Sequence, residues 1–424
     1  MMDRQELFYL WEGRLRFRMC FKRIIYLVCV TLVLFLLPCI VLADNDAVST
    51  VLAARSINAF ALDLYKELAT KGGNIFFSPY SISAALTMTY IGARGETATE
   101  MKKVLRFVGN EDQIHPAMQM LQNRFDGIPE EQGVIDIANR LWLNAESEYF
   151  TDFTSTVVRY YGAGVTSVDF SGGPENARIT INDWVAENTR SKIRDLLQQG
   201  DIDELTRLVL TNAIYFNSNW LHQFDKANTR DLPFYTGLNQ HFTVPMMSRT
   251  GNFMYSENTD LQWIKIPYTI PNLSMLILLP SQNETFTQLD VLENMLTPEY
   301  FIELINLMVY TQISLSMPRF KDEQRYSLPA TLRKLGMRKA FSDADFTGIM
   351  NRDDLYITDV IHQAFIEVDE EGTEAAAATA VIMGVRGLID PEPVKVFNAN
   401  RPFIYMLFDE TTEVILFMGR LERP

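Results

Sequence analysis

The chain has 424 residues, of which 47% are hydrophobic, so it is long enough to bury a large core. Its formal net charge of −15 disfavours nucleic acid and anionic polysaccharide as general partners, because both are polyanions. All three cysteines, Cys20, Cys29 and Cys39, lie before residue 40. The remainder of the chain therefore carries neither a disulfide framework nor a thiol nucleophile.

The N-terminal segment has the layout of a secretory signal. Residues 24–43 are almost wholly apolar, five basic residues shortly precede them, and Val41-Leu42-Ala43 resembles a small-residue cleavage site. This pattern predicts a signal peptide over 1–43, with Met19 as an alternative start, then one secreted extracellular domain over 44–424. The apolar run is also long enough to span a bilayer, so a type II membrane anchor is the alternative.

The first half of the chain predicts mainly helices. Apolar residues recur at helical spacing over 50–70, and Ser81 has the position of an N-cap for an apolar helix over 82–91. Further helices are predicted over 97–106 and 114–125, and one or two helices over 174–197. An amphipathic segment is predicted over 149–161, and strands over 135–143, 165–170 and 208–216.

The second half predicts mainly strands. Strand-like runs separated by turn residues cover 232–236, 241–247, 252–256, 261–268, 273–279, 311–320, 355–367, 394–397, 403–409 and 413–421. Helices are predicted between them, over 288–308 and 327–335. Because helices and strands intermingle without an internal repeat or a linker, the sequence favours one large α+β domain.

The sequence offers no motif of a metal-dependent, nucleotide-binding or serine-nucleophile enzyme. Its four histidines, His115, His222, His241 and His362, form no HExxH pair. His362 falls inside a predicted strand, which favours a hydrogen-bonded core histidine. The sequence therefore predicts a protein that is not an enzyme and that uses no metal and no cofactor.

Two Asn-x-Ser/Thr sequons, at Asn272 and Asn283, border the apolar run that precedes Pro280. Both fall at turn-like positions. In a secreted chain they are predicted glycan acceptors.

One stretch joins acidic residues to a run of small ones, Asp369-Glu-Glu-Gly-Thr-Glu-Ala-Ala-Ala-Ala-Thr-Ala380, and a single basic residue, Arg386, follows before Pro391. Four consecutive alanines favour a surface helix. Gly372 before them and β-branched residues after them favour a segment that serves either as an exposed loop or as a buried strand, since small side chains fit into a packed sheet. The pattern alone leaves both interpretations open.

Several long motifs, in order along the chain, resemble the serpin family. They are Asn74-Ile-Phe-Phe-Ser-Pro-Tyr-Ser81, Leu210-Thr-Asn-Ala-Ile-Tyr-Phe-Asn-Ser-Asn-Trp220, the stretch from Asp359 to Ala380, Asn400-Arg-Pro-Phe403 and Leu416-Phe-Met-Gly419. The resemblance covers about residues 50–424. It implies the serpin fold, an α+β fold of three β-sheets (A, B and C) with eight or nine helices, and an exposed reactive-centre loop at about 370–391.

The resemblance implies suicide inhibition of a serine protease, in which the protease is acylated by the loop and carried along as the loop inserts into sheet A. The implied hinge comprises Glu370, Glu371, Gly372, Thr373, Glu374, Ala375, Ala376, Ala377, Ala378 and Thr379. Alternate residues of an inserted strand point inward, and those from Thr373 onward are small or β-branched. No proline falls between 370 and 390, so every backbone N–H can join a ladder.

In inhibitory serpins the bond attacked usually follows the seventeenth residue counted from the hinge glutamate. Counting from Glu370 reaches Arg386, the only basic residue of the loop, with Gly387 after the cut. A guanidinium pairs with an acidic residue in the primary pocket of trypsin-like proteases. The predicted partner is therefore a trypsin-like serine protease in a covalent complex. The alternative is a non-inhibitory serpin that acts as a carrier or binding module.

Other residues match the family's mobile regions. Asn74, Ser78, Ser81, Asn212 and His362 match the shutter, a polar cluster beneath sheet A, and Trp220 matches the breach, where the hinge first enters. Polar side chains suit a place that must exchange hydrogen bonds while the sheet opens. The predicted helix over 114–125 offers little positive charge, so no heparin cofactor is expected. The chain is expected to act as a monomer.

Overall fold

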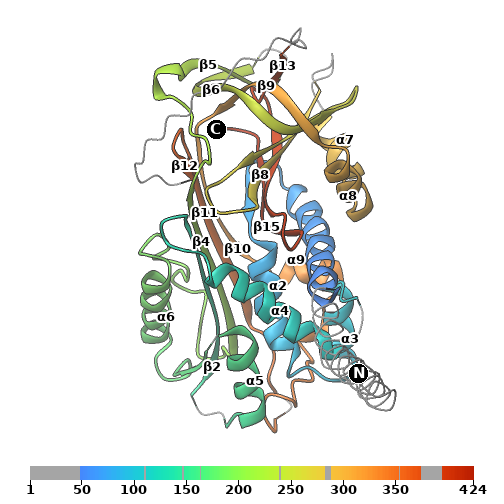
Figure 1. Cartoon of the computed structure of the whole chain (residues 1–424). Coiled ribbons are helices and arrows are strands. Elements are labelled where there is room, and N and C mark those ends of the chain that lie inside the picture. The colour runs from blue at the N-terminus through green and yellow to red at the C-terminus, as the bar shows by residue number, and fades with distance from the viewer. Residues whose placement is uncertain are drawn as a thin grey trace, which may run out of the picture. The chain divides into compact units, whose positions relative to one another are not determined.

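The computed structural model describes residues 48–108, 111–145, 148–162, 164–237, 240–281, 288–352, 354–373 and 394–424. The chain divides into two compact units, Met1–Thr50 and Val51–Pro424. The second unit carries the sheets and the candidate site (Figure 1). In the described part of the chain, no helix is both long and apolar enough to cross a membrane.

Helices account for much of the first half of the second unit. Residues 48–69 form the first helix. The others are α2 (Pro79–Tyr90), α3 (Gly95–Val104), α4 (Glu111–Asp126), α5 (Thr151–Tyr161), α6 (Pro174–Asn188), α7 (Gln288–Met295), α8 (Pro298–Asn306) and α9 (Pro329–Leu335), with two 3-10 turns, η1 (Lys226–Asn228) and η2 (Lys339–Phe341).

Strands predominate from β4 onward. They are β1 (Ile75–Phe77), β2 (Val134–Asn144), β3 (Val165–Val168), β4 (Leu208–Asn219), β5 (Arg230–Gly237), β6 (Gln240–Glu257), β7 (Leu261–Pro267), β8 (Leu273–Pro280), β9 (Val309–Pro318), β10 (Phe320–Ser327), β11 (Asp359–Val368), β12 (Gly372–Thr373), β13 (Lys395–Asn398), β14 (Phe403–Asp409) and β15 (Val414–Leu421).

The strands form two hydrogen-bonded networks among the described residues. The first is a six-stranded sheet in the order β10-β11-β12-β4-β2-β3, and the second has nine strands, from β1 through β15, β14, β8, β7, β6 and β9 to β13, with β5 paired to β6. The resemblance to serpins implies three sheets. The last two are continuous here because the 18-residue β6 pairs with β5 at one end and with β7 and β9 further along.

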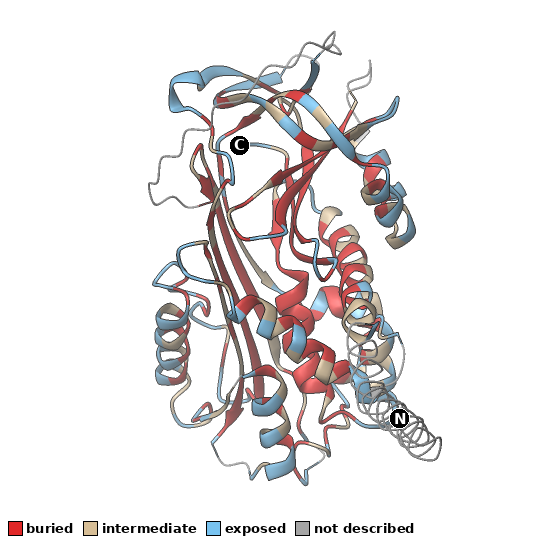
Figure 2. Cartoon of the chain, viewed as in Figure 1, coloured by how far each residue is buried: buried red, intermediate tan, exposed pale blue. Residues whose placement is uncertain are grey.

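The core lies between the two networks and around α2. All twelve residues of α2 are buried, so this helix needs no polar face, and Figure 2 shows it buried in the middle of the unit. β4 and β11 are buried along nearly their whole length, as expected for central strands covered on both faces. A smaller apolar cluster lies beneath α6.

Three local predictions are wrong in informative ways. The N-cap of α2 is Ser78, not Ser81: its side chain accepts the N–H of Ser81, and Pro79 occupies the first turn. Of the one or two helices predicted over 174–197, the structure has α6, which ends at Asn188 because Arg190 and Ser191 have φ of 51° and 60°. The predicted helix over 288–308 divides into α7 and α8, with Thr297 capping α8 before a proline.

Residues 189–202, which follow α6, form a non-helical segment that we call the arm. Ile193 and Leu196 of the arm belong to one apolar cluster with Ala213 of β4 and Ile361 of β11. The arm therefore crosses the junction between the two central strands of the six-stranded sheet.

Candidate functional site

The central strands β4 and β11 are paired along one half and separated along the other. Residues 359–364 of β11 pair in parallel with residues 209–214 of β4. Further along, the two-residue strand β12 lies between them, with Thr373 opposite Ser218 of β4 and opposite Val368 of β11, antiparallel to both. The first hinge residues thus already occupy the space between the two strands.

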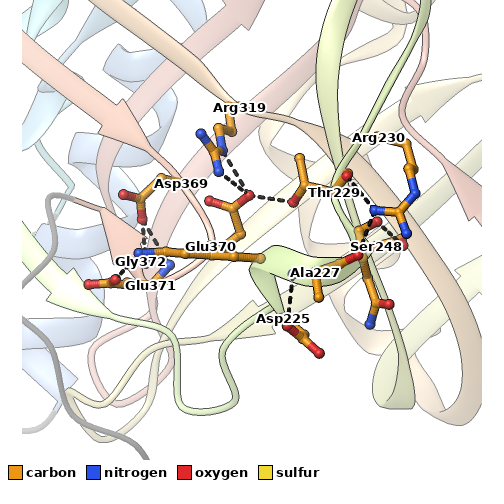
Figure 3. Close-up of polar contacts among 12 residues, drawn as sticks. Asp225, Ala227, Thr229, Arg230, Ser248, Arg319, Asp369, Glu370, Glu371 and Gly372 are labelled. Atoms are coloured by element: carbon orange, nitrogen blue, oxygen red, sulfur yellow. Dashed lines mark hydrogen bonds and ion pairs between the residues drawn. The ribbon is translucent and has the colours of Figure 1, made fainter.

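A tight turn brings the chain from β11 back into this space. The Asp369 carboxylate accepts the backbone N–H groups of Glu371 at 2.8 Å and Gly372 at 3.1 Å, as Figure 3 shows. A side chain at Gly372 has no room, because an ideal Cβ there would lie 2.3 Å from the Ser218 carbonyl oxygen. The acidic residue and the glycine are therefore both needed for β12 to enter the sheet.

The Glu370 side chain fixes the hinge to neighbouring elements. It is fully buried, accepts a hydrogen bond from Arg319 Nε at 2.8 Å, and accepts another from the Thr229 hydroxyl (Figure 3). Burial acts to raise the pKa of Glu370, but the hydrogen bonds from Arg319 and Thr229 outweigh it, and the net pKa lies below the usual value. The neighbouring Glu371 forms a more exposed ion pair with Lys226.

Trp220, the predicted breach residue, contacts the turn that leads into β12. Its indole Nε1 donates to the Asp369 carbonyl at 2.9 Å, and its backbone N–H donates to the Glu371 carbonyl at 2.8 Å. The indole stacks on Tyr268 at a centroid distance of 4.4 Å, and the Tyr268 hydroxyl lies 2.8 Å from the Thr373 hydroxyl. Two buried aromatic rings therefore line the entrance and contact the end of β12.

Further along the β4–β11 pair, a buried polar cluster joins the two strands to α2. Ser81 Oγ donates to Asn139 Oδ1 at 2.9 Å and accepts from Asn212 Nδ2 at 2.6 Å. Ser78 Oγ donates to the Leu416 carbonyl at 2.6 Å. His362 contacts both Ser78 and Asn212. Four predicted shutter residues are therefore in contact with one another, directly or through one intermediary.

The tautomer of His362 follows from its partners. Its Nε2 accepts the backbone N–H of Ser78 at 3.0 Å, and an amide N–H can only donate. Nδ1 therefore carries the proton and donates to the carbonyl and side-chain oxygens of Asn212. Complete burial lowers the pKa of His362 from 6.5 to about 3, so the ring is neutral at physiological pH.

Asn74 is wrong as a shutter residue. Its amide nitrogen donates to the Arg423 carbonyl at 2.7 Å, and its oxygen accepts the N–H of Glu422 at 2.8 Å. Asn74 immediately precedes β1, which pairs antiparallel with β15, so the register places it beside the end of the chain. It attaches the C-terminus and takes no part in the polar cluster.

Sequence reasoning missed three residues that complete the site. Asn139 joins the shutter from β2, and Arg319 and Thr229 hold Glu370. Asn139 had a usable signal, because it shares the α2-facing side of β2 with Ile135, Ile137 and Leu141, and a polar residue in such a row needs a partner. The sequence around Arg319 and Thr229 gave no such signal. Arg319 follows a proline and Thr229 follows a turn, and polar residues are common at both kinds of position.

Part of the predicted loop lies outside the described residues. Glu374, Ala375, Ala376, Ala377, Ala378, Thr379, Arg386 and Gly387 are there, as is the sequon at Asn283. The other sequon residue, Asn272, is exposed and donates through Nδ2 to Thr411 Oγ1 at 3.1 Å.

The two central strands of this sheet are paired at one end, and the hinge separates them at the other. This arrangement defines a class of protein that is able to add a strand to its own sheet. A family model, Serpin (serine protease inhibitor), matches residues 55–424. The chain belongs to the serpin family. The predicted family and α+β serpin fold are thereby confirmed.

Relatives with established names are similar over nearly their whole length. Serpin B6 of Pongo abelii is 40% identical over 380 residues, covering 88% of this chain and 99% of the relative. Leukocyte elastase inhibitor of Equus caballus is 40% identical over 375 residues, covering 86% and 97%. Among solved structures, human thyroxine-binding globulin complexed with thyroxine is 29% identical with a TM-score of 0.78, covering 88% of this chain and 98% of that one.

The expectation of a secreted or membrane-anchored protein is wrong. Serpin B6 and leukocyte elastase inhibitor are intracellular-type serpins that lack signal peptides. The expectation of secretion was based only on composition, namely basic residues followed by an apolar run. The similarity to these relatives outweighs that pattern. Because glycans are added in the secretory pathway, the reason for expecting them at Asn272 and Asn283 is removed as well.

Proposed function

We propose that this serpin is a suicide inhibitor of trypsin-like serine proteases, attacked at the bond between Arg386 and Gly387. The protease serine adds to the Arg386 carbonyl carbon, the bond to the Gly387 nitrogen breaks, and that nitrogen leaves with a proton as a new amino terminus. The protease remains joined to Arg386 as an ester. The hinge then extends β12 between β4 and β11 and carries the acylated protease with it.

One observation supports this proposal above the others: Gly372 and Thr373 already form a strand between β4 and β11. Extension of β12 needs only that the strands continue to separate beyond it. After Glu374 the sequence continues with six small residues, Ala375 to Ala380, and no proline occurs before 391. The similarity to leukocyte elastase inhibitor gives independent support for an inhibitor in general.

Incubation with trypsin tests the proposal. An SDS-stable complex of one chain with one protease is expected, and Arg386→Ala is expected to lower the association rate with trypsin at least a hundredfold, since the guanidinium contributes a charge-assisted pair in the protease pocket. Lys71→Ala, an exposed residue outside the loop, is the matched control and keeps the wild-type rate. Complex formation by Arg386→Ala at the wild-type rate would refute the assignment of the reactive bond.

A specific cavity favours a second candidate function, that of a carrier. A cavity of about 670 Å³ lies between the helix over 48–69 and α8, and its wall includes the apolar Leu62, Phe301, Ile302 and Ile305. Three basic residues (Arg55, Lys66 and Arg106) and three acidic ones (Asp63, Glu299 and Glu413) also line it. Such a wall suits an amphipathic ligand that carries both charges, and thyroxine-binding globulin, which is similar in fold, holds thyroxine. Cleavage of the loop by trypsin without any covalent complex, together with saturable thyroxine binding, would favour the carrier over the inhibitor.

A further inference from the structure

A second cavity, of about 380 Å³, lies where the arm passes over β10 and β11. Lys192, Arg194 and Asp195 line it on the arm side, and Lys321, Glu323 and Glu367 line it on the sheet side. The arm wall thus has a formal charge of +1 and the sheet wall one of −1. The cavity separates opposite charges across its width.

The floor of this cavity carries a hydrogen-bond acceptor that lacks a donor. Gln363 and Phe365, alternate residues on one face of β11, form the floor. The Gln363 amide donates from Nε2 to Glu323 Oε1 at 2.8 Å, which fixes its orientation, because the reversed amide would set two acceptors against each other. Its Oε1 is buried and has no hydrogen-bond partner, and the residue is only 7% exposed. The Gln363 Oε1 atom therefore lacks an N–H donor.

The cavity is placed where a ligand affects the opening of the sheet. The arm spans the β4–β11 junction and is tied to the far strand, since Arg325 of β10 donates to the Leu196 carbonyl at 2.6 Å and pairs with Asp201. Extension of β12 separates β4 from β11 beneath the arm, so the arm must yield. A ligand that joins the arm to β11 resists that movement.

We propose that this cavity binds a small zwitterion, an amino acid or short peptide. Its ammonium group lies against Glu323 and supplies the donor for Gln363. Its carboxylate lies against Arg194 on the arm. Binding itself is independent of the function proposed above, whereas its effect on loop insertion rests on that function.

Calorimetric titration of the full chain with three tripeptides tests the binding. Triglycine is a zwitterion, N-acetyltriglycine lacks the ammonium group, and triglycinamide lacks the carboxylate. Saturable binding of triglycine at one site is expected, with each blocked peptide at least tenfold weaker. Absence of saturable heat with triglycine, or equal affinity for all three peptides, would overturn the proposal.

Variants locate the binding. Gln363→Met, close in shape but without the acceptor, and Arg194→Gln on the exposed arm are each expected to weaken triglycine binding at least fivefold. Gln312→Met, on the exposed side of β9, is the matched control and keeps the wild-type affinity. If Gln363→Met does not fold, the affinity of Arg194→Gln for triglycine tests the proposed site on its own. Unchanged affinity in that variant would refute the site.

The effect on insertion has its own measurement. With saturating triglycine, the number of serpin molecules consumed per trypsin molecule inhibited is expected to rise at least twofold, because slower insertion leaves more time for the ester to hydrolyse. Trypsin alone with triglycine is the control. An unchanged ratio refutes the role of the arm. A chain cleaved without any complex refutes the proposed function instead, and the titration still decides the site.

Discussion

His362 makes the native state sensitive to acid through one hydrogen bond. Its Nε2 must stay unprotonated to accept the Ser78 N–H, and burial lowers its pKa from 6.5 to about 3. Between these values the unfolded chain binds a proton and the native chain does not. The stability that the neutral ring contributes is therefore complete above pH 6.5 and is lost as the pH falls toward 3, by at most about 1.4 kcal/mol per pH unit.

Urea unfolding at pH 7.5 and 5.5 measures this dependence. The wild-type midpoint is expected to fall at pH 5.5. His362→Phe is less stable at both values, because the Ser78 N–H and the Asn212 Oδ1 lose their partner, and it is expected to show a smaller fall. His241→Phe is the control, since His241 is exposed, and its dependence should match the wild type. An equal fall in His362→Phe and wild type would show that other groups cause the acid sensitivity.

Glu370 is the second residue whose charge matters. Its buried carboxylate faces Arg319, so Glu370→Lys places two cations together at the turn that leads into β12. The expected result is release of the hinge and faster polymerisation on gentle heating, by at least tenfold. The rate is followed by native gel electrophoresis and light scattering.

The reversed pair and a distant charge control this result. Glu370→Lys combined with Arg319→Glu restores opposite charges and is expected to slow polymerisation again, at least in part. Glu204→Lys makes the same change at an exposed position and should leave the rate unaltered. Equal rates for Glu370→Lys and the combined variant would mean that the ion pair does not hold the hinge.

At the scale of the element, we expect the two-residue strand β12 to determine how many serpin molecules trap a protease and how many are simply cleaved. Gly372→Ala sets a Cβ 2.3 Å from the Ser218 carbonyl oxygen, so β12 is displaced from β4. More serpin molecules are then expected to be cleaved per protease trapped. Gly237→Ala is the matched control, because its nearest neighbour would lie 3.7 Å away. The ratio of serpin to trypsin at complete inhibition measures the difference, and an unchanged ratio in Gly372→Ala would refute it.

The elements that carry long local signals could be predicted from the sequence. The sequence predicts a strand over 355–367, and β11 lies at Asp359–Val368. The motif around Trp220 places the end of β4. The acidic turn and glycine before the alanines also indicated a segment able to enter a sheet. In each case the residues that determine the structure are neighbours in the chain.

The parts that failed depend on partners far away in the sequence. Asn74 bonds to residues 348 and 349 positions later, so its own surroundings give no sign of its role. The continuity of β6 depends on which strands flank it, and the predicted runs over 241–247 and 252–256 join because β9 pairs across the gap at Ser248 to Gly251. Arg319 and Thr229 acquire a function only when the turn brings Glu370 to them.

At the scale of the whole molecule, the proposed function requires that the uncut chain does not have the lowest free energy, and the pairing of β4 with β11 supplies a physical reason. These strands run parallel over residues 209–214 and 359–364, whereas β12 is antiparallel to both. An inserted loop strand would replace one parallel ladder with two antiparallel ladders, which are more stable per residue. In the proposed function the loop inserts fully only after it is cut, so a kinetic barrier preserves the uncut native state.

Cutting the loop without trapping a protease is therefore expected to stabilise the protein. A metalloprotease that cleaves within 380–390 forms no ester, so the freed strand inserts alone. About ten additional ladder hydrogen bonds, at about 1 kcal/mol each, correspond to a rise of roughly 13 °C in the unfolding midpoint. Thermal unfolding of intact and cleaved chains, followed by circular dichroism, measures the rise. Gly372→Ala, which cannot seat β12, should gain less on cleavage, and equal midpoints for intact and cleaved wild type would exclude insertion.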